Sequence, residues 1–201
     1  ETNILKLTDS LSKDPSCFLV SPTSYDESMN KMTYSGGPFP ENLSRDIVLN
    51  LSGNTCVEST LGACMLVRTN EFKYIGLFDE NFFLYFSDDD LCRRIRKHKK
   101  SVIQIYDSKC IHIHGIVKIK NKYLKKFARE NNYTFDSLYY YYKIHPNHAE
   151  VKKILKKTSS LTIKFFIKIL SLNFIEFVGI SARLFAISRF IFRFKLKKSK
   201  F

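Results

Sequence analysis

The stretch that decides the fold is Gly76-Leu-Phe-Asp-Glu-Asn-Phe-Phe-Leu-Tyr-Phe-Ser-Asp-Asp-Asp-Leu-Cys-Arg-Arg94. Its second half predicts a helix over residues 88–100, because Ser87 can serve as the N-cap, three aspartates fill the first turn, and Arg, Lys and His fill the last. The apolar face of this helix would consist of Leu91, Cys92 and Ile95. Acidic residues in a first turn are common and stabilising without any function, so this motif alone does not indicate a site.

Short apolar runs on either side predict strands. Residues 17–20 and 62–68 have the all-apolar character of buried strands, the first of them parallel, and residues 102–106 and 110–114 predict two shorter strands. Residues 3–13 predict a helix that ends at Asp-Pro. The apolar face of that helix would comprise Ile4, Leu7 and Leu11, with Thr2 or Asn3 as N-cap. Helices and strands alternate without a hairpin signal, which favours an α/β fold.

The region between the first two predicted strands, residues 22–55, is rich in Pro, Gly, Ser and Asn and predicts a long loop. The cysteines are odd in number, widely spaced and without a Cys-x-x-Cys pair, which favours reduced, buried thiols over a zinc site or a disulfide framework. They are Cys17, Cys56, Cys64, Cys92 and Cys110.

Charge is unevenly distributed along the 201 residues. The first hundred residues hold 12 basic and 14 acidic side chains, whereas the rest hold 21 and 5, so the second half carries a net charge of +16. Such a half suits an anionic partner, either nucleic acid or an acidic membrane surface. Residues 119–157 predict a basic, Tyr- and Lys-rich helical segment. In residues 158–201 cations interrupt an apolar run too often for a membrane span, which favours a helix lying in the membrane interface over a buried helical hairpin.

Aromatic residues stand directly before the acidic helix. They can form the floor of a pocket for a sugar ring, whose C–H faces stack on aromatic rings, with the carboxylates directed into that pocket from the helix N-terminus. These aromatic residues are Phe82, Phe83, Tyr85 and Phe86.

The block from residue 61 to 115 resembles the family 2 glycosyltransferases, especially the rhamnosyltransferase-like branch that builds surface polysaccharides. The matching elements are Gly62-Ala63, then Gly76 to Tyr85, then Ser87 to Arg94, then Ser108-Lys-Cys-Ile-His112. Leu19-Val-Ser-Pro22 and Tyr34-Ser-Gly-Gly37 are also similar to segments of that family. The resemblance covers residues 1–118 and implies the acceptor-side half of a GT-A, Rossmann-like α/β domain.

The resemblance also implies roles for individual residues. The acceptor's general base falls on Asp88, and the histidine that in some members helps hold the metal and diphosphate falls on His112, with His114 as the alternative. Asp79 and Glu80 match a turn that would contact acceptor hydroxyls, although a helix-capping role is equally open. The substrate-binding set further includes Asp90 and Tyr85.

Two departures from the family stand out. Ser87 replaces the usual Glu, and Asp89 stands where the family has an apolar residue. The nucleotide-binding half, with most ligands for a divalent Mg or Mn ion, is expected before residue 1, so we expect the chain alone to be inactive.

The function so implied is inverting transfer of a sugar such as rhamnose from a nucleotide-sugar donor to a saccharide or lipid-linked acceptor. The tail would hold the enzyme at the cytoplasmic face of an anionic membrane. Nucleic acid is not expected as a partner, because the Phe and Ile density after residue 161 suits lipid. Two alternatives remain open at this point: a non-catalytic remnant, and a basic binding module for an anionic membrane or nucleic acid.

Overall fold

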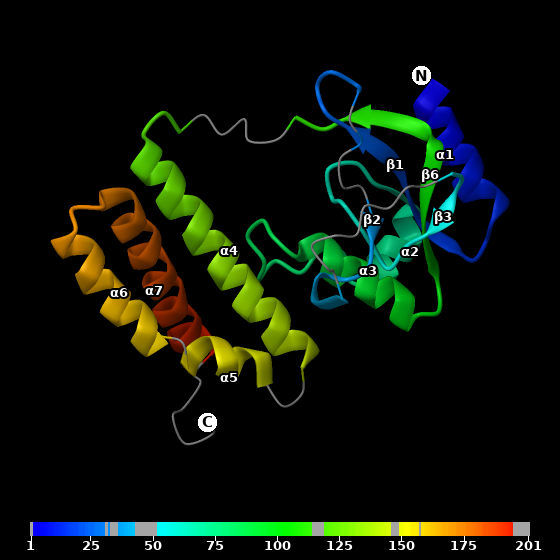
Figure 1. The fold of residues 1–201 in the computed structure, drawn as a ribbon. Coiled ribbons are helices and arrows are strands. Elements are labelled where there is room, and N and C mark those ends of the chain that lie inside the picture. The colour runs from blue at the N-terminus through cyan, green and yellow to red at the C-terminus, as the bar shows by residue number, and fades with distance from the viewer. Residues whose placement is uncertain are drawn as a thin grey trace. The chain divides into compact units, whose positions relative to one another are not determined.

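The structure is a computed structural model and describes residues 2–30, 32, 36–42, 52–113, 119–145, 149–156 and 158–194. The chain forms two compact units, residues 1–79 with 87–116 and residues 80–86 with 117–201 (Figure 1). The segments 119–157 and 158–201, separated in the sequence analysis, thus fall within one unit. His114, Tyr34 and Ser35 lie outside the described residues.

The first unit is a mixed α/β unit. Its elements, in chain order, are α1 (Thr2–Lys13), β1 (Cys17–Tyr25), β2 (Gly36–Gly37), the 3-10 turn η1 (Pro40–Asn42), β3 (Thr55–Cys56), β4 (Ser59–Thr60), β5 (Leu66–Val67), α2 (Thr69–Tyr74), α3 (Ser87–Lys97) and β6 (Ser101–Ile111).

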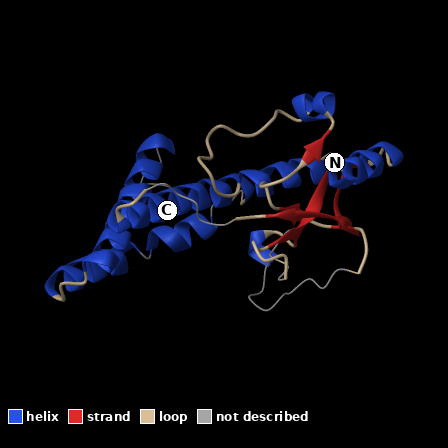
Figure 2. Cartoon of the chain, turned by 90° about the horizontal axis from the view of Figure 1, so that it is seen from above, coloured by secondary structure: helices blue, strands red, loops and turns tan. Residues whose placement is uncertain are grey.

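The main sheet of this unit has four strands in the order β3-β6-β1-β5. β1 and β6 are parallel, as predicted for the first buried strand, whereas β3 and β5 pair antiparallel at the two edges. β2 and β4 form a separate antiparallel pair. Figure 2 shows the strands in red. The sheet is therefore mixed, and its antiparallel pairs join strands remote in sequence, which no local hairpin signal reveals.

Two groups of buried side chains flank the long strands. Leu7 and Leu11 of α1 pack with Cys17 and Val20 of β1, and the predicted apolar face of α3 packs in a separate cluster that includes Phe18. Parallel strands buried in this way are almost continuously apolar, which explains the run at 17–20. Helix α1 was thus correctly predicted, except that Ile4 is 64% exposed rather than part of the core. Helix α3 was predicted with its apolar face, but it ends at Lys97 instead of residue 100, and Ser87 is its first residue rather than its N-cap.

The two strands predicted over 102–106 and 110–114 are one continuous strand, β6. Its register against β1 shifts where Pro22 pairs with Ile105 and Thr23 with Lys109. The side chain of Asn3 accepts a hydrogen bond from the Lys109 N–H and donates one to the Lys109 carbonyl, so α1 is attached to β6 directly after this irregularity. Asn3 is therefore not the predicted N-cap.

The prediction of a buried strand over 62–68 was largely wrong. Only Leu66–Val67 is a strand, and it is half-buried, while residues 62–64 are exposed in a turn. Cys64 is consequently exposed, as is Cys56, whereas Cys17 and Cys92 are buried and all five thiols are free. The expectation of buried thiols was correct for Cys17 and Cys92 only.

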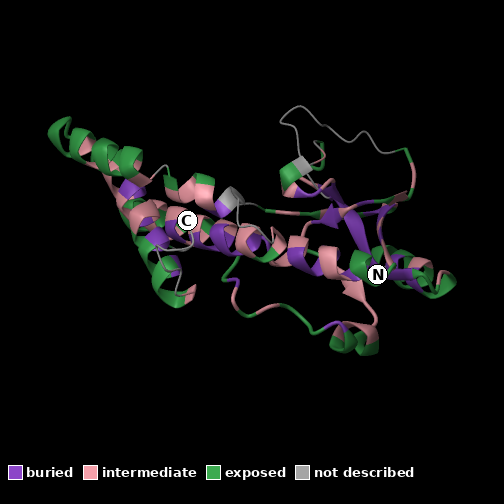
Figure 3. Cartoon of the chain, turned by 90° about the horizontal axis from the view of Figure 1, so that it is seen from below, coloured by how far each residue is buried: buried purple, intermediate pink, exposed green. Residues whose placement is uncertain are grey.

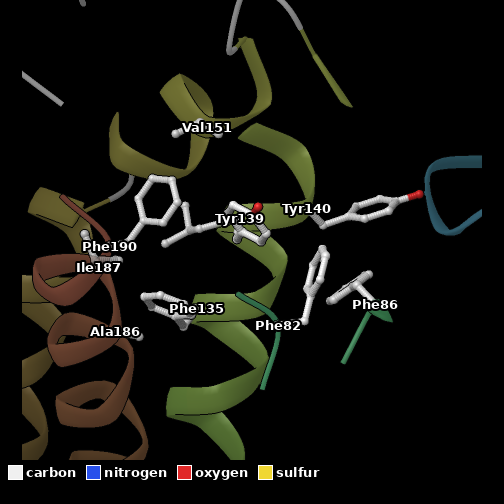
Figure 4. Packing of buried hydrophobic residues seen from close by; sticks show 10 residues of the cluster. Phe82, Phe86, Phe135, Tyr139, Tyr140, Val151, Ala186, Ile187 and Phe190 are labelled. Carbon is white, nitrogen blue, oxygen red and sulfur yellow. The ribbon is translucent and has the colours of Figure 1, made fainter. Parts of the chain in front are cut away.

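The second unit is helical, as the composition of residues 119–194 predicts. Its helices are α4 (Lys122–Ile144), α5 (Ala149–Lys156), α6 (Thr158–Leu170) and α7 (Phe174–Phe194). α4 and α7 pack along each other through a core rich in aromatic side chains, to which the segment 80–86 contributes two phenylalanines (Figure 4). The small side chains of Ala182 and Ala186, both fully buried, allow the close approach of these helices.

α7 and α6 differ sharply in burial. Six residues of α7 are buried, so residues 174–194 of the predicted membrane-interface segment form a helix that packs into the core of the second unit. α6 buries none, which the colouring of Figure 3 lets the reader follow. Among the described helices, none combines the length and the apolar character that crossing a bilayer requires.

Candidate functional site

The carboxylate of Asp88 is held at the start of α3 by two backbone donors. Its Oδ2 accepts the N–H of Gly62 at 2.8 Å, and its Oδ1 accepts the N–H of Asp89 at 3.1 Å. Each carboxylate oxygen can accept two hydrogen bonds, so both retain acceptor capacity. Among the described residues Asp88 has no cationic partner within ion-pair distance. The side chain is half-buried, and thus oriented without being neutralised.

Gly62 is required at this position by close packing against Asp88. A Cβ atom on Gly62 would lie 3.2 Å from both the Cβ and the Oδ2 of Asp88. That separation is shorter than ordinary van der Waals contact, so a side chain at position 62 requires Asp88 to shift by a few tenths of an ångström. The Gly-Ala element of the sequence is therefore a turn that holds Asp88.

Asp89 lies in a different environment from its neighbour. Its Oδ1 accepts the hydroxyl of Ser59 at 2.5 Å, and the side chain is largely removed from water. Burial, followed by the charge of Asp88, raises the pKa of Asp89 to about 7, although the Ser59 hydrogen bond opposes the rise. Asp89 is therefore largely protonated below neutral pH, which removes one of the three like charges.

Asp90 is buried, with 2% of its surface exposed, and it pairs with Arg94 one turn later at 2.9 Å. Arg94 also donates to the carbonyls of Ile75 and Leu77, on either side of Gly76. This ion pair thus fixes the turn between α2 and the aromatic segment. The carboxylate of Asp90 is covered and paired, and its contact with substrate stays a prediction.

The remaining predicted substrate residues are distributed over both units. Asp79 is half-buried and belongs to the first unit, whereas Glu80 is exposed and belongs to the second. Tyr85 is half-buried in the second unit, where its ring packs edge-on against Tyr133 at 5.3 Å, and burial raises the pKa of its hydroxyl.

The four aromatic residues predicted to form the floor of a sugar pocket before α3 do not form one surface. Phe82 and Phe86 are buried in the core of the second unit, where Phe86 stacks on Tyr140 with ring centroids 5.1 Å apart. Phe83 is 74% exposed. Phe86 is therefore turned into the core, whereas Phe82 and Phe83 both line a small cavity of the second unit.

His112 follows directly after β6 and is half-buried. The backbone N–H of His112 donates to the backbone carbonyl of Tyr25, at the end of β1, at 2.9 Å. Within the described ranges no group of three or more His, Cys, Asp or Glu side chains is arranged to hold a metal ion. The metal role of His112 stays a prediction.

Sequence reasoning missed Asp136 on α4. Its fully buried carboxylate accepts the backbone N–H groups of residues 83, 84 and 85 at 3.0, 2.9 and 2.8 Å. Three charge-assisted hydrogen bonds hold the aromatic segment within the second unit. A lone carboxylate among Phe, Leu and Tyr was the available signal, but nothing local indicated its partners.

Comparison with known proteins adds no family assignment. No protein-family model matches the chain, and no curated protein matches it significantly.

Proposed function

We propose that this chain is the acceptor-side part of an inverting glycosyltransferase, with Asp88 as the general base. The observation that carries the proposal is the arrangement of its carboxylate, which two backbone N–H groups orient and no cation neutralises among the described residues. A general base must be held within hydrogen-bond reach of the proton that it removes, and must keep a lone pair free to accept it.

The proposed reaction is a single displacement. The oxygen of the acceptor hydroxyl attacks the anomeric carbon as the bond to the nucleoside diphosphate breaks, and the proton of that hydroxyl passes to Asp88. The Gly62 turn and the first turn of α3 keep the carboxylate fixed during this step. A divalent metal, held by residues of the donor-side half, would offset charge on the leaving diphosphate.

The assignment of Asp88 as the base is supported by the contacts of the two neighbouring aspartates, which bind other groups of the protein. Asp90 positions the Gly76 turn through Arg94, and Asp89 is largely protonated below neutral pH.

Replacing Asp88 by Asn tests the proposal in the enzyme that includes the donor-side half. Asn keeps the size and the hydrogen-bond acceptor but cannot take up a proton, so turnover falls by roughly 10²- to 10⁴-fold with donor binding little changed. Asp89→Asn is the matched control, because it imitates the protonated aspartate, and it leaves turnover near wild type at pH 6–7. Equal rates for the two variants would contradict the role of Asp88 and favour a non-catalytic remnant.

We also propose that α6 and the turn after it bind an anionic membrane surface. Large apolar side chains are exposed there, including Phe166 at 59%, Leu170 at 83% and Leu172 at 71%. Lys164 and Lys168 lie on the same helix. Exposed apolar side chains between cations suit the boundary between lipid headgroups and acyl chains, and suit nucleic acid poorly.

Co-sedimentation with vesicles tests this second proposal. Leu170→Ser with Leu172→Ser should lower binding to vesicles that contain phosphatidylglycerol, and Lys164→Glu with Lys168→Glu should lower it further at low salt. Tyr74→Ser in the first unit, also exposed (80%), is the control. Binding that is unchanged in both α6 variants, or preferred binding to single-stranded nucleic acid, would exclude α6 as a membrane surface.

A further inference from the structure

A small cavity in the second unit brings together two arginines of α7. Its volume is about 100 Å³, and its lining includes Arg189, Arg193, Asn132 of α4 and Glu80. All of these residues belong to the second unit. Arg189 and Arg193 are four residues apart on one helix, so their side chains lie on the same face.

Neutral groups hold both guanidinium groups in place. Arg193 donates to the Oδ1 of Asn81 at 2.8 Å, and Arg189 donates to the Oδ1 of Asn131 at 3.3 Å. The two guanidinium carbons lie 5.8 and 4.8 Å from the ring centre of Phe135, which is buried. Each arginine is therefore oriented by an amide oxygen and an aromatic ring, and most of its N–H donors remain available.

No carboxylate neutralises this pair within the described part of the chain. Neither arginine forms an ion pair there, although Arg183, one to two turns earlier on the same helix, pairs with Glu130 at 2.8 Å. Glu80 lines the cavity without reaching ion-pair distance of either guanidinium. With Glu80 ionised, the lining still carries one net positive charge.

We infer that this cavity binds a phosphate or diphosphate group. Two guanidinium groups offer planar, fork-shaped sets of donors that match phosphate oxygens, and a doubly charged anion relieves the repulsion between them. The acceptor oxygens of Glu80 and Asn132 suit a hydroxyl group beside the phosphate. In the proposed enzyme this ligand is the phosphate of a lipid-linked acceptor, an assignment that rests on the proposed function, whereas anion binding itself does not.

Calorimetric titration of the full chain with inorganic pyrophosphate tests the site. We expect saturable binding that weakens roughly tenfold or more in Arg189→Gln with Arg193→Gln. Lys73→Gln with Lys97→Gln removes the same charge from exposed positions of the first unit, outside the cavity, and should leave the affinity within about twofold. Asn132→Asp is a second test that keeps both arginines and adds a negative charge to the lining, and it should weaken binding as well.

Vesicles identify the source of the phosphate. If a lipid supplies it, the chain prefers vesicles with phosphatidic acid, a phosphate monoester, over vesicles of equal charge with phosphatidylglycerol, and Arg189→Gln with Arg193→Gln abolishes that preference. Pyrophosphate binding without such a preference would support the site with a soluble phosphate compound. Absence of both effects, or equal losses in the Lys73 and Lys97 control, would overturn the inference. Neither measurement requires glycosyl transfer, so a failure of the anion-site inference is distinguishable from a failure of the proposed glycosyltransferase function.

Discussion

The pKa of Asp89 predicts that this residue destabilises the fold as the pH rises. In the unfolded chain the carboxyl of Asp89 ionises near its ordinary pKa of 3.8, whereas in the fold burial and the charge of Asp88 raise its pKa to about 7. Between these values the folded state binds the extra proton, so the free energy of unfolding falls with rising pH. A pKa difference of about three, at about 1.4 kcal/mol for each pKa unit, corresponds to about 4 kcal/mol. This contribution to stability is fully present below about pH 4 and is lost as the pH rises from about 4 to 7.

Urea denaturation of wild type and Asp89→Asn at pH 4, 5.5, 7 and 8 measures this effect. Asn cannot ionise, so the variant should gain stability over wild type as the pH rises, by up to about 4 kcal/mol at pH 7 and above. Ser59→Ala supplies an internal check, because loss of the hydroxyl donor raises the pKa of Asp89 and moves the pH window upward. A stability difference between Asp89→Asn and wild type that is the same at all four pH values would refute the reasoning.

Two further substitutions test one contact in each unit, that of Asp136 in the second unit and that of Gly62 in the first. Asp136→Ala removes the acceptor of three N–H groups of residues 83–85 and should lower the free energy of unfolding by about 3–5 kcal/mol. Asp136→Asn should lower it less. Urea denaturation measures both losses, and a loss below about 1 kcal/mol for Asp136→Ala would contradict the anchoring role. Gly62→Ala should lower turnover of the enzyme with its donor-side half by displacing Asp88, while stability changes by less than about 1 kcal/mol; wild-type turnover would show that the contact is dispensable.

The candidate site shows where sequence reasoning ends. The order Ser-Asp-Asp-Asp correctly placed three carboxylates at the start of a helix, because helix caps and the helix dipole depend on neighbouring residues. It did not distinguish them. Asp88 faces the Gly62 turn, Asp89 meets Ser59, and Asp90 is buried against Arg94, and two of these three partners lie about 30 residues away in the chain.

The sequence by itself determined α1, α3 and the helical character of the second unit, since apolar periodicity and capping residues act over one or two turns. It indicated only residues 17–20 of β1, which continues to Tyr25 into the segment predicted as a loop. The tertiary structure decided which side chains lose contact with water. Phe82 and Phe86 entered a helical core instead of a sugar pocket because Asp136, some fifty residues later, binds the backbone between them. The tertiary structure likewise places Arg193 within hydrogen-bond distance of Asn81, which is 112 residues away in the chain. Solvent exclusion and pairing of this kind depend on residues remote in sequence, so no local pattern carries them.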